Sequence, residues 1–143
     1  MTKEVLVTIE GIQLGTDDDA VKNVSEGTYH YRNGKHYIHF DEVAADGGAI
    51  TKNTIKISSN QIDITKKGSY NTQMTFCINE DSATDYRTPF GNLFLGIHTT
   101  MLQVEVKVEE IKIRIHYSLE INDAYVSDNK IRVLIEPKKK AGK

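Results

Sequence analysis

The sequence lacks the features of a disulfide-stabilised or membrane-spanning protein. Its single cysteine, Cys77, excludes an intramolecular disulfide. No window comes near the roughly 18 uninterrupted apolar residues that a transmembrane helix needs. The start of the chain has no apolar run of signal-peptide length before charged residues intervene. These absences predict a cytoplasmic protein of bacterial type, with one reduced thiol and no insertion into a membrane.

The sequence also has no excess of one charge and little alanine or leucine. Lys and Arg number 18 and Asp and Glu number 20, so the net charge of −2 excludes a strongly basic nucleic-acid-binding chain. A hydrophobic content of 38% excludes an acidic disordered protein. Ile, Val and Thr number 16, 10 and 13, against 7 Ala and 7 Leu, and β-branched residues favour strands over helices.

Apolar and polar residues alternate along much of the chain, most clearly from Ile111 to Ile121. Successive side chains of a strand point to opposite faces, so this pattern predicts strands with one apolar and one polar face. Between Val108 and Ile111 the apolar phase shifts, and Glu109-Glu110 therefore marks a turn or bulge. The predicted strands are 3–14, 24–32, 35–43, 51–58, 61–67, 70–79, 91–100, 102–108, 111–121 and 130–136.

Short turns connect these strands. Asn33-Gly34 is the strongest hairpin signal, because a type I′ turn requires positive φ at both central residues, and it pairs Arg32 with Lys35. Ser59-Asn60 indicates a second tight hairpin. The connections at 15–23, 44–50, 80–88 and 122–129 are predicted to be the least ordered, with one helical turn at 16–21.

Many meandering strands in one small domain have to hide their edges. A closed or nearly closed barrel achieves this best, a sandwich is the alternative, and sequential hairpins favour an up-and-down barrel over a Greek key. We therefore predict an all-β protein with a single antiparallel up-and-down barrel of about 8–10 strands. The barrel would cover residues 1–137, and the basic stretch 138–143 would be a frayed, disordered tail.

Three segments of the chain form a recognisable set. They are Tyr86-Arg87-Thr88-Pro89-Phe90-Gly91 with the following Thr99, Lys66-Lys67-Gly68 with Met74 and Phe76, and Tyr117-Ser118-Leu119. Together they resemble the YwiB-like family of small bacterial proteins. The resemblance covers almost the full chain. It departs at Lys67, where the family usually has arginine, and in the polar stretch after Gly47-Gly48. It implies a calycin, lipocalin-like β-barrel and supplies no catalytic residues.

The segment around Pro89 is the first candidate ligand site. In the functional interpretation Tyr86, Thr88 and Phe90 border the mouth of the barrel and order a ligand entrance. In the structural interpretation this segment is a strand entry, where Pro89 fixes φ and Gly91 permits a bend. The structural interpretation is favoured, because proline and glycine in loops have such direct backbone uses.

The hairpin 24–43 is the second candidate. Its register places Arg32, Tyr37 and His39 on one face. The better core candidate is the other face, with Tyr29, Tyr31, His36, Ile38 and Phe40. In a polar lumen the first face would hold an anionic head group, and otherwise it is solvated. His30 and His39 lie diagonally, about 7 Å apart, but no third ligand accompanies them, so no metal site is predicted.

The remaining residues provide no catalytic motif. Cys77 has no local cation or helix N-terminus that would lower its pKa, so an unreactive, half-buried thiol is expected. Asp17-Asp18-Asp19 lacks the spacing of a calcium loop. The absence of GxSxG, GxGxxG and P-loop motifs predicts no ATP or NAD chemistry and no cofactor. The basic tail is interpreted as solubilising, and no nucleic acid is expected as a partner.

Three functions fit these patterns. The first is a non-enzymatic protein that holds a small apolar or amphipathic ligand in the barrel, which requires a continuous cavity above roughly 300 Å³. The second is a structural or interaction barrel with a packed lumen, which forms a homodimer or docks on a partner, with strand 111–121 as the interface if one of its faces is unfilled. The third, an isomerase-type enzyme, rests on fold analogy alone. The first is expected.

Overall fold

The structure is a computed structural model that describes residues 3–13, 21–43, 48–68, 71–88 and 91–138. Its strands are β1 (Glu4–Gln13), β2 (Val21–Arg32), β3 (Lys35–Val43), β4 (Ile50–Ile57), β5 (Gln61–Lys67), β6 (Thr72–Cys77), β7 (Asp81–Thr88), β8 (Gly91–Lys107), β9 (Glu110–Ile121) and β10 (Ala124–Pro137). The described residues include no helix, so the all-β prediction is confirmed. Accordingly, this part of the chain has no helix that is long and apolar enough to cross a membrane.

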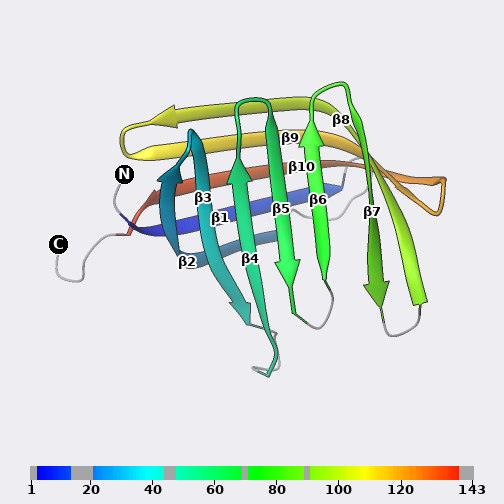
Figure 1. Ribbon diagram of the computed structural model, residues 1–143, viewed down its shortest axis with the longest axis horizontal. Coiled ribbons are helices and arrows are strands. Elements are labelled where there is room, and N and C mark those ends of the chain that lie inside the picture. The colour runs from blue at the N-terminus through cyan, green and yellow to red at the C-terminus, as the bar shows by residue number, and fades with distance from the viewer. Residues whose placement is uncertain (1–2, 14–20, 44–47, 69–70, 89–90, 139–143) are drawn as a thin grey trace.

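The ten strands form one antiparallel sheet in the order β6-β5-β4-β3-β2-β1-β10-β9-β8-β7. Strands that follow one another in the chain are neighbours, and the first strand pairs with the last, from Val5 opposite Pro137 to Gln13 opposite Asn129. In Figure 1, β3 to β7 run across the front and β1, β8, β9 and β10 cross behind them. The predicted up-and-down barrel is therefore confirmed.

The barrel is nearly closed where β6 meets β7. No ladder joins these two strands, but Ser82 Oγ donates a hydrogen bond to the Thr75 carbonyl over 2.7 Å. In the turn between them, Asn79 has a φ of 59° and donates its N–H to the Thr99 carbonyl of β8 over 3.1 Å. Individual hydrogen bonds and side-chain packing thus replace a ladder at this seam.

The alternation of the sequence divides each strand between the core and solvent. On β9, Ile111, Ile113 and Ile115 are at most 1% exposed, whereas Lys112 and Arg114 between them are exposed. These two charged side chains consequently lie on the outside of the barrel. Strand 111–121 was expected to form an interface if one of its faces was unfilled. That condition is not met, since the inner face of the strand is filled and its outer face is polar.

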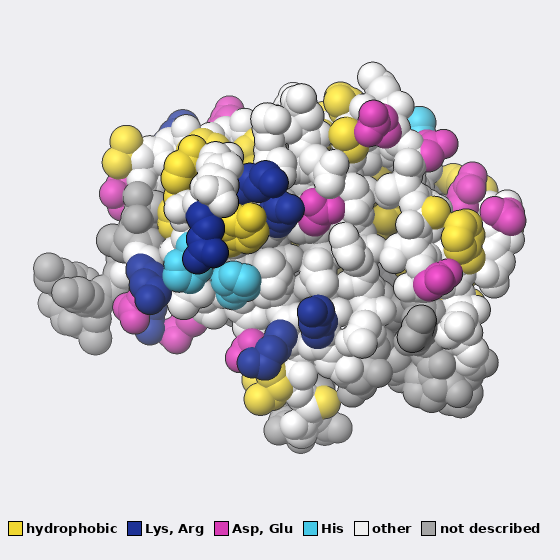
Figure 2. Space-filling view, viewed as in Figure 1, with side chains coloured by type: hydrophobic (Ala, Val, Ile, Leu, Met, Phe, Trp, Pro, Cys, Tyr) yellow, Lys and Arg dark blue, Asp and Glu magenta, His cyan; other side chains and the backbone are white. Residues whose placement is uncertain are grey.

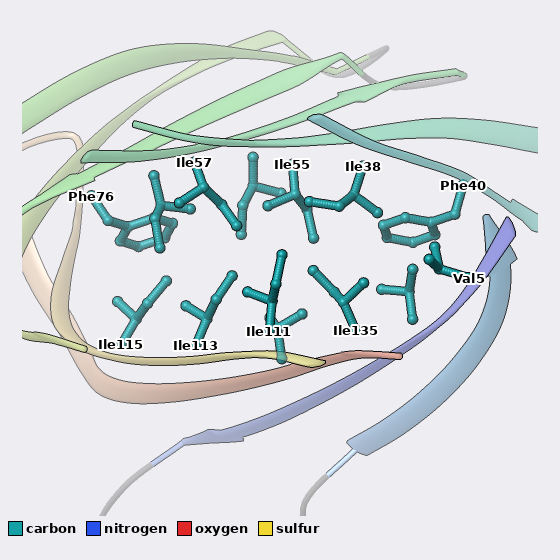
Figure 3. Close-up of a cluster of buried hydrophobic side chains, with 14 of the residues drawn as sticks. Val5, Ile38, Phe40, Ile55, Ile57, Phe76, Ile111, Ile113, Ile115 and Ile135 are labelled. Atoms are coloured by element: carbon teal, nitrogen blue, oxygen red, sulfur yellow. The ribbon is translucent and has the colours of Figure 1, made fainter. Parts of the chain in front are cut away.

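Apolar side chains from both layers fill the interior. Figure 3 shows Ile38, Ile55 and Ile57 of the front layer facing the isoleucines of β9 and β10. Phe76 of β6 is 0% exposed, and its ring stands edge-on to Tyr117 of β9 with 5.0 Å between the ring centroids. The centre of this barrel is thus a packed core, and the polar lumen considered for the hairpin does not form there.

The turns and registers predicted for the hairpins are confirmed, whereas Tyr31, which was expected on the core face, is 63% exposed at the end of its strand. Asn33 and Gly34 have φ values of 53° and 74°, and they join β2 to β3 with Arg32 opposite Lys35 and Tyr29 opposite Ile38. The tight turn at 58–60 joins β4 to β5, where the Ser58 N–H donates to the Gln61 carbonyl over 2.9 Å. The phase shift before Ile111 is the turn at Val108-Glu109 between β8 and β9.

Some predicted boundaries were wrong. Residues 80–88 were expected to be a connection, but 81–88 form β7, whose alternation is masked by polar side chains on its inner side such as Ser82 and Thr84. The segments 91–100 and 102–108 are one strand, β8, with a register shift between Thr99 and Met101. Strand β10 begins at Ala124 instead of 130, because a bulge between Tyr125 and Ser127 interrupts its alternation.

Two predictions concern segments that lie mostly outside the described residues. The helical turn expected at 16–21 lies outside the described residues except for Val21, which begins β2. Residues 139–143 of the expected tail also lie outside them. Lys138, the first residue of that stretch, donates its N–H to the Glu4 carbonyl over 3.0 Å.

Candidate functional site

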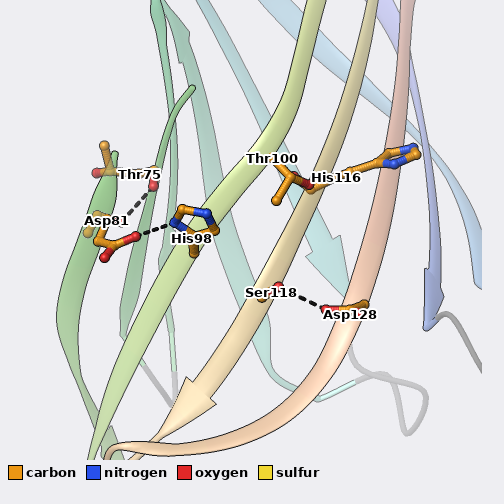
Figure 4. A network of polar contacts seen from close by, with 8 residues as sticks. Thr75, Asp81, His98, Thr100, His116, Ser118 and Asp128 are labelled. Atoms are coloured by element: carbon orange, nitrogen blue, oxygen red, sulfur yellow. Dashed lines mark hydrogen bonds and ion pairs between the residues drawn. The ribbon is translucent and has the colours of Figure 1, made fainter. Parts of the chain in front are cut away.

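A row of polar side chains crosses the outer face of four neighbouring strands. Asp81 of β7 is opposite His98 of β8, His98 is opposite Ser118 of β9, and Ser118 is opposite Asp128 of β10. His98 donates through Nδ1 to the Asp81 carboxylate, and Ser118 Oγ donates to Asp128 Oδ1 over 2.8 Å (Figure 4). The antiparallel registers therefore bring together residues that are up to 47 positions apart in the chain.

The next row along the same face contains a glycine and forms a hollow. Ala83, Gly96, Glu120 and Tyr125 are opposite one another on β7 to β10. Because Gly96 has no side chain, the surface is depressed between Phe94 and Tyr125. We call this hollow the outer groove; it has a volume of about 470 Å³ and is lined by Asp81, Ser82, Ala83, Phe94, Gly96, Ile97, His98, Ser118, Glu120 and Tyr125.

Two aromatic residues form the walls of the outer groove. Phe94 is 44% exposed and Tyr125 is 64% exposed. The turn between β9 and β10 holds Phe94 in place, because the Phe94 N–H donates to Asn122 Oδ1 over 3.0 Å and the Asn122 N–H donates to the Phe94 carbonyl over 2.8 Å. Partial desolvation and the nearby Asp128 carboxylate raise the pKa of the Tyr125 hydroxyl, so it stays protonated.

The outer groove is acidic. Its described lining contains the carboxylates of Asp81 and Glu120 and neither Lys nor Arg. Figure 2 shows acidic side chains gathered at the right-hand end of the molecule, where β7 and the β9–β10 hairpin lie. Within the described residues Glu120 makes no ion pair. Aromatic faces beside a carboxylate attract cations, so the groove suits a positively charged ligand with an apolar part.

The polar row has the Asp-His-Ser order of a catalytic triad and its aspartate–histidine hydrogen bond, but no serine–histidine hydrogen bond completes it among the described residues. A nucleophilic serine needs to donate its proton to a neighbouring base. Ser118 instead donates to Asp128. No group of three or more His, Cys, Asp and Glu gathers to hold a metal within the part of the chain that the structure describes.

Comparisons with known proteins agree with this architecture. A family model described as a domain of unknown function, DUF1934, matches residues 7–133. The chain belongs to this family. It is 24% identical over 127 residues to the uncharacterized β-barrel protein YwiB of Bacillus subtilis (strain 168), with 86% of this chain and 87% of that protein covered. The resemblance read from the sequence is thereby confirmed.

The fold is also found in a solved structure. The crystal structure of the ywiB protein from Bacillus subtilis superposes with a TM-score of 0.81, over 96% of this chain and 93% of that chain. The TM-score establishes the shared barrel. At a sequence identity of 17%, the comparison shows the fold alone and says nothing about the chemistry of the surface. The outer groove therefore has to be argued from the residues of this chain.

The residues predicted for the first candidate site belong to β7 or follow it in the sequence. Tyr86 and Thr88 belong to β7, with Tyr86 opposite Leu93 and Thr88 opposite Gly91. The side chains of Tyr86 and Thr88 and the whole of Phe90 lie outside the described residues. The ligand-binding role of these three residues stays a prediction.

The second predicted set lies on the outside of the barrel. Ile38 and Phe40 point into the core, as the favoured interpretation required, so Arg32, Tyr37 and His39 are on the outer face. His39 Nδ1 is hydrogen-bonded to Thr54 Oγ1 over 3.0 Å. The strands β4, β5 and β6 separate this set from β7, so the sheet does not bring the two predicted sets together.

The pKa values of Cys77 and His36 shift in opposite directions. A hydrogen bond with Glu80, followed by burial, raises the pKa of the Cys77 thiol, in line with the unreactive cysteine that was expected. Burial lowers the pKa of His36, whose Nδ1 is 2.6 Å from Tyr29 Oη.

The stability of the barrel is expected to decrease as the pH falls below about 6.5, the ordinary value for histidine. The folded-state pKa of His36 is lowered, so between that value and 6.5 the unfolded chain binds more protons than the folded one. We expect urea unfolding at pH 7.5 and 5.5 to show a smaller loss in His36→Gln than in the wild type. Equal losses in both proteins would contradict a contribution from His36.

Proposed function

We propose that this chain is a cytoplasmic, non-enzymatic binding protein whose ligand is a small amphipathic cation held in the outer groove. The observation that carries the proposal is the open floor at Gly96, between two exposed aromatic rings and beside the Glu120 carboxylate. An apolar ring or chain would pack between Phe94 and Tyr125, and its amino group would reach Glu120. A protonated amine near an aromatic face gains roughly 0.5–2 kcal/mol.

The interior of the barrel is a less suitable location. A hollow on the inner side, lined in part by Val7, Phe40 and Lys66, has a volume of only about 50 Å³. Ligand pockets commonly measure about 300–1,000 Å³. The outer groove, at about 470 Å³, falls in that range. We therefore propose the outside of the barrel, and not its lumen, as the place where a small ligand binds.

The contacts of Ser118 support a binding role in place of catalysis. Its hydroxyl is committed to Asp128, and the imidazole of His98 is oriented by Asp81. Such fixed donors and acceptors suit recognition of a ligand, since they pre-organise the polar edge of the groove.

A titration with tryptamine, followed by NMR of the ¹⁵N-labelled protein, tests the proposal. Indole-3-propionate is the matched control probe, because it has the same ring and the opposite charge. We expect tryptamine to shift amide signals of β7 to β10 and indole-3-propionate to bind at least about threefold more weakly, as a surface charge pair predicts. Equal binding of both probes, or shifts confined to other strands, would contradict the proposed site.

Gly96→Val is the decisive variant. A Cβ at this position would lie 3.4 Å from Glu120 Oε2, an ordinary contact, so valine fills the groove without entering the core. Valine also favours strands more than glycine does, by up to about 1 kcal/mol. We expect tryptamine binding to be lost in this variant while the thermal midpoint is unchanged or raised. Undiminished binding would exclude the outer groove.

The structural or interaction barrel remains the second candidate function. It is favoured by the packed interior and by valines that stay exposed along one strand. These valines belong to a different part of the molecule from the outer groove, so the two functions are compatible.

A further inference from the structure

The C-terminal half of β8 is hydrogen-bonded to a neighbouring strand on one side only. The strand pairs with β7 between Gly91 and His98 and with β9 between Leu95 and Lys107. The segment Leu102–Lys107, which we call the β8 edge, therefore has β9 as its one ladder partner among the described residues. In Figure 1 this segment runs along the upper margin of the molecule, toward the turn that joins β8 to β9.

The β8 edge carries exposed valines. Val104 and Val106 are 37% and 53% exposed, although their partners Ile113 and Ile111 on β9 are 1% and 0% exposed. Val108 in the adjoining turn is 80% exposed. Hydrophobic side chains are visible in Figure 2 at the upper left, the end where this hairpin lies. Apolar side chains beside unpaired backbone N–H and C=O groups form a template for another strand.

The charges of the β8 edge specify which strand fits. Glu105 and Lys107 alternate with the valines, both are exposed, and neither forms an ion pair within the described residues. An antiparallel strand that offers lysine opposite Glu105 and glutamate opposite Lys107, with one valine between them, is complementary to this edge. The β8 edge of a second copy has that pattern when the strands run in opposite directions.

We propose that the β8 edge pairs with the β8 edge of a second copy of this chain, with Val106 on the two-fold axis. Glu105 of each copy is then opposite Lys107 of the other, and Val104 is opposite Val108. An axis at Glu105 would place two carboxylates opposite each other, which is destabilising. An axis at Val104 would place Glu105 opposite Gln103 and leave Lys107 opposite Met101. Charge complementarity therefore selects Val106.

This contact joins two ten-stranded sheets through one short pair of strands. Such a pairing buries less than the roughly 1,200–2,000 Å² of standard interfaces, so the dimer forms reversibly and its population depends on protein concentration. A two-fold, isologous contact closes on itself and does not propagate into fibres. None of the residues that line the outer groove belongs to the β8 edge, so the dimer and the ligand site are independent.

Sedimentation velocity of the full chain over a range of concentrations tests the dimer. The wild type is expected to associate as concentration rises. Lys107→Glu alone and Glu105→Lys alone each place like charges opposite each other twice. We expect the dimer dissociation constant of each single variant to rise at least about tenfold. The double variant restores both pairs and is expected to associate like the wild type.

An equimolar mixture of the two single variants provides the sharpest comparison. One chain then carries only positive charges at 105 and 107 and the other only negative charges, so the mixture is expected to form heterodimers where each variant alone is monomeric. Lys130→Glu, the same charge change on the outer face of β10, is the control and is expected to leave association unchanged. Circular dichroism establishes that every variant is folded.

Either of two results would overturn the proposal. A wild type that stays monomeric at the highest concentration would show that the β8 edge does not pair with itself. Association of the single variants equal to that of the wild type, with folded spectra, would place any dimer interface elsewhere.

Discussion

Replacement of Phe76 by alanine is expected to lower the free energy of unfolding by about 3–5 kcal/mol. The Phe76 side chain is 0% exposed, and its ring contacts Tyr117 edge-on at 5.0 Å between centroids. This contact joins β6 to β9 beside the seam where no ladder connects β6 to β7. A cavity there removes apolar packing beside a seam that has no backbone ladder. Urea denaturation of wild type and variant measures the loss.

Phe94→Ala is the matched control for this experiment. It removes the same atoms from a ring that is 44% exposed on the outer face of β8. Because no core cavity forms, the expected loss is below about 1 kcal/mol. If both variants lost similar stability, the packed interior would not be the main source of the barrel's stability.

Gly27→Ala is expected to cost about 2–3 kcal/mol, far more than a single methyl group usually does. A Cβ on Gly27 would lie 2.5 Å from the His39 carbonyl oxygen and 3.2 Å from Phe40 Cβ. Gly27 of β2 is opposite Phe40 of β3, so the missing side chain allows these two strands to approach each other. The added methyl group has to displace backbone, since the nearest atom belongs to the main chain. Thermal unfolding of wild type and variant reports the change.

Gly11→Ala on β1 distinguishes this close approach from a general effect of glycine in strands. A Cβ on Gly11 meets no atom within 4 Å. Alanine there is expected to be neutral or to stabilise by up to about 1 kcal/mol, because it restricts the unfolded chain. Destabilisation of both variants to the same degree would contradict the contact at Gly27.

The predictable parts of the fold are those governed by local chemistry. Asn33 and Gly34 are residues that tolerate positive φ, so the turn, its register and the inward side of Ile38 and Phe40 follow from the sequence. Strand β7 was missed because its strand state depends on pairing with β8. Ser82 and Thr84 face inward near the seam, where polar side chains remain compatible with the fold, and they hide the usual alternation.

The outer groove could not be predicted for a related reason. Gly96, Glu120 and Tyr125 are neighbours only because of the registers between β8, β9 and β10, and the bulge before Ser127 sets the last of these. No spacing in the sequence encodes that arrangement. A weak signal did exist: His98, Ser118 and Glu120 all fall on the polar side of their strands, and a predicted register would have placed them together. The predicted set of Arg32, Tyr37 and His39 depended on a polar lumen, and the inward isoleucines prevent one.

The pairing of β1 with β10 gives the two ends of the chain an unusual place. Strands β1 and β10 are the sixth and seventh of the ten strands in the sheet, side by side, while the break in the ladder lies between β6 and β7. Loss of a terminal strand would therefore not trim a border of the sheet. Without β1, the strands β2–β6 would be severed from β7–β10, and each part would expose a new edge and half of the core. The terminal segment from Glu4 to Gln13 is in this sense the central strand of the protein, and truncation there divides the barrel in two.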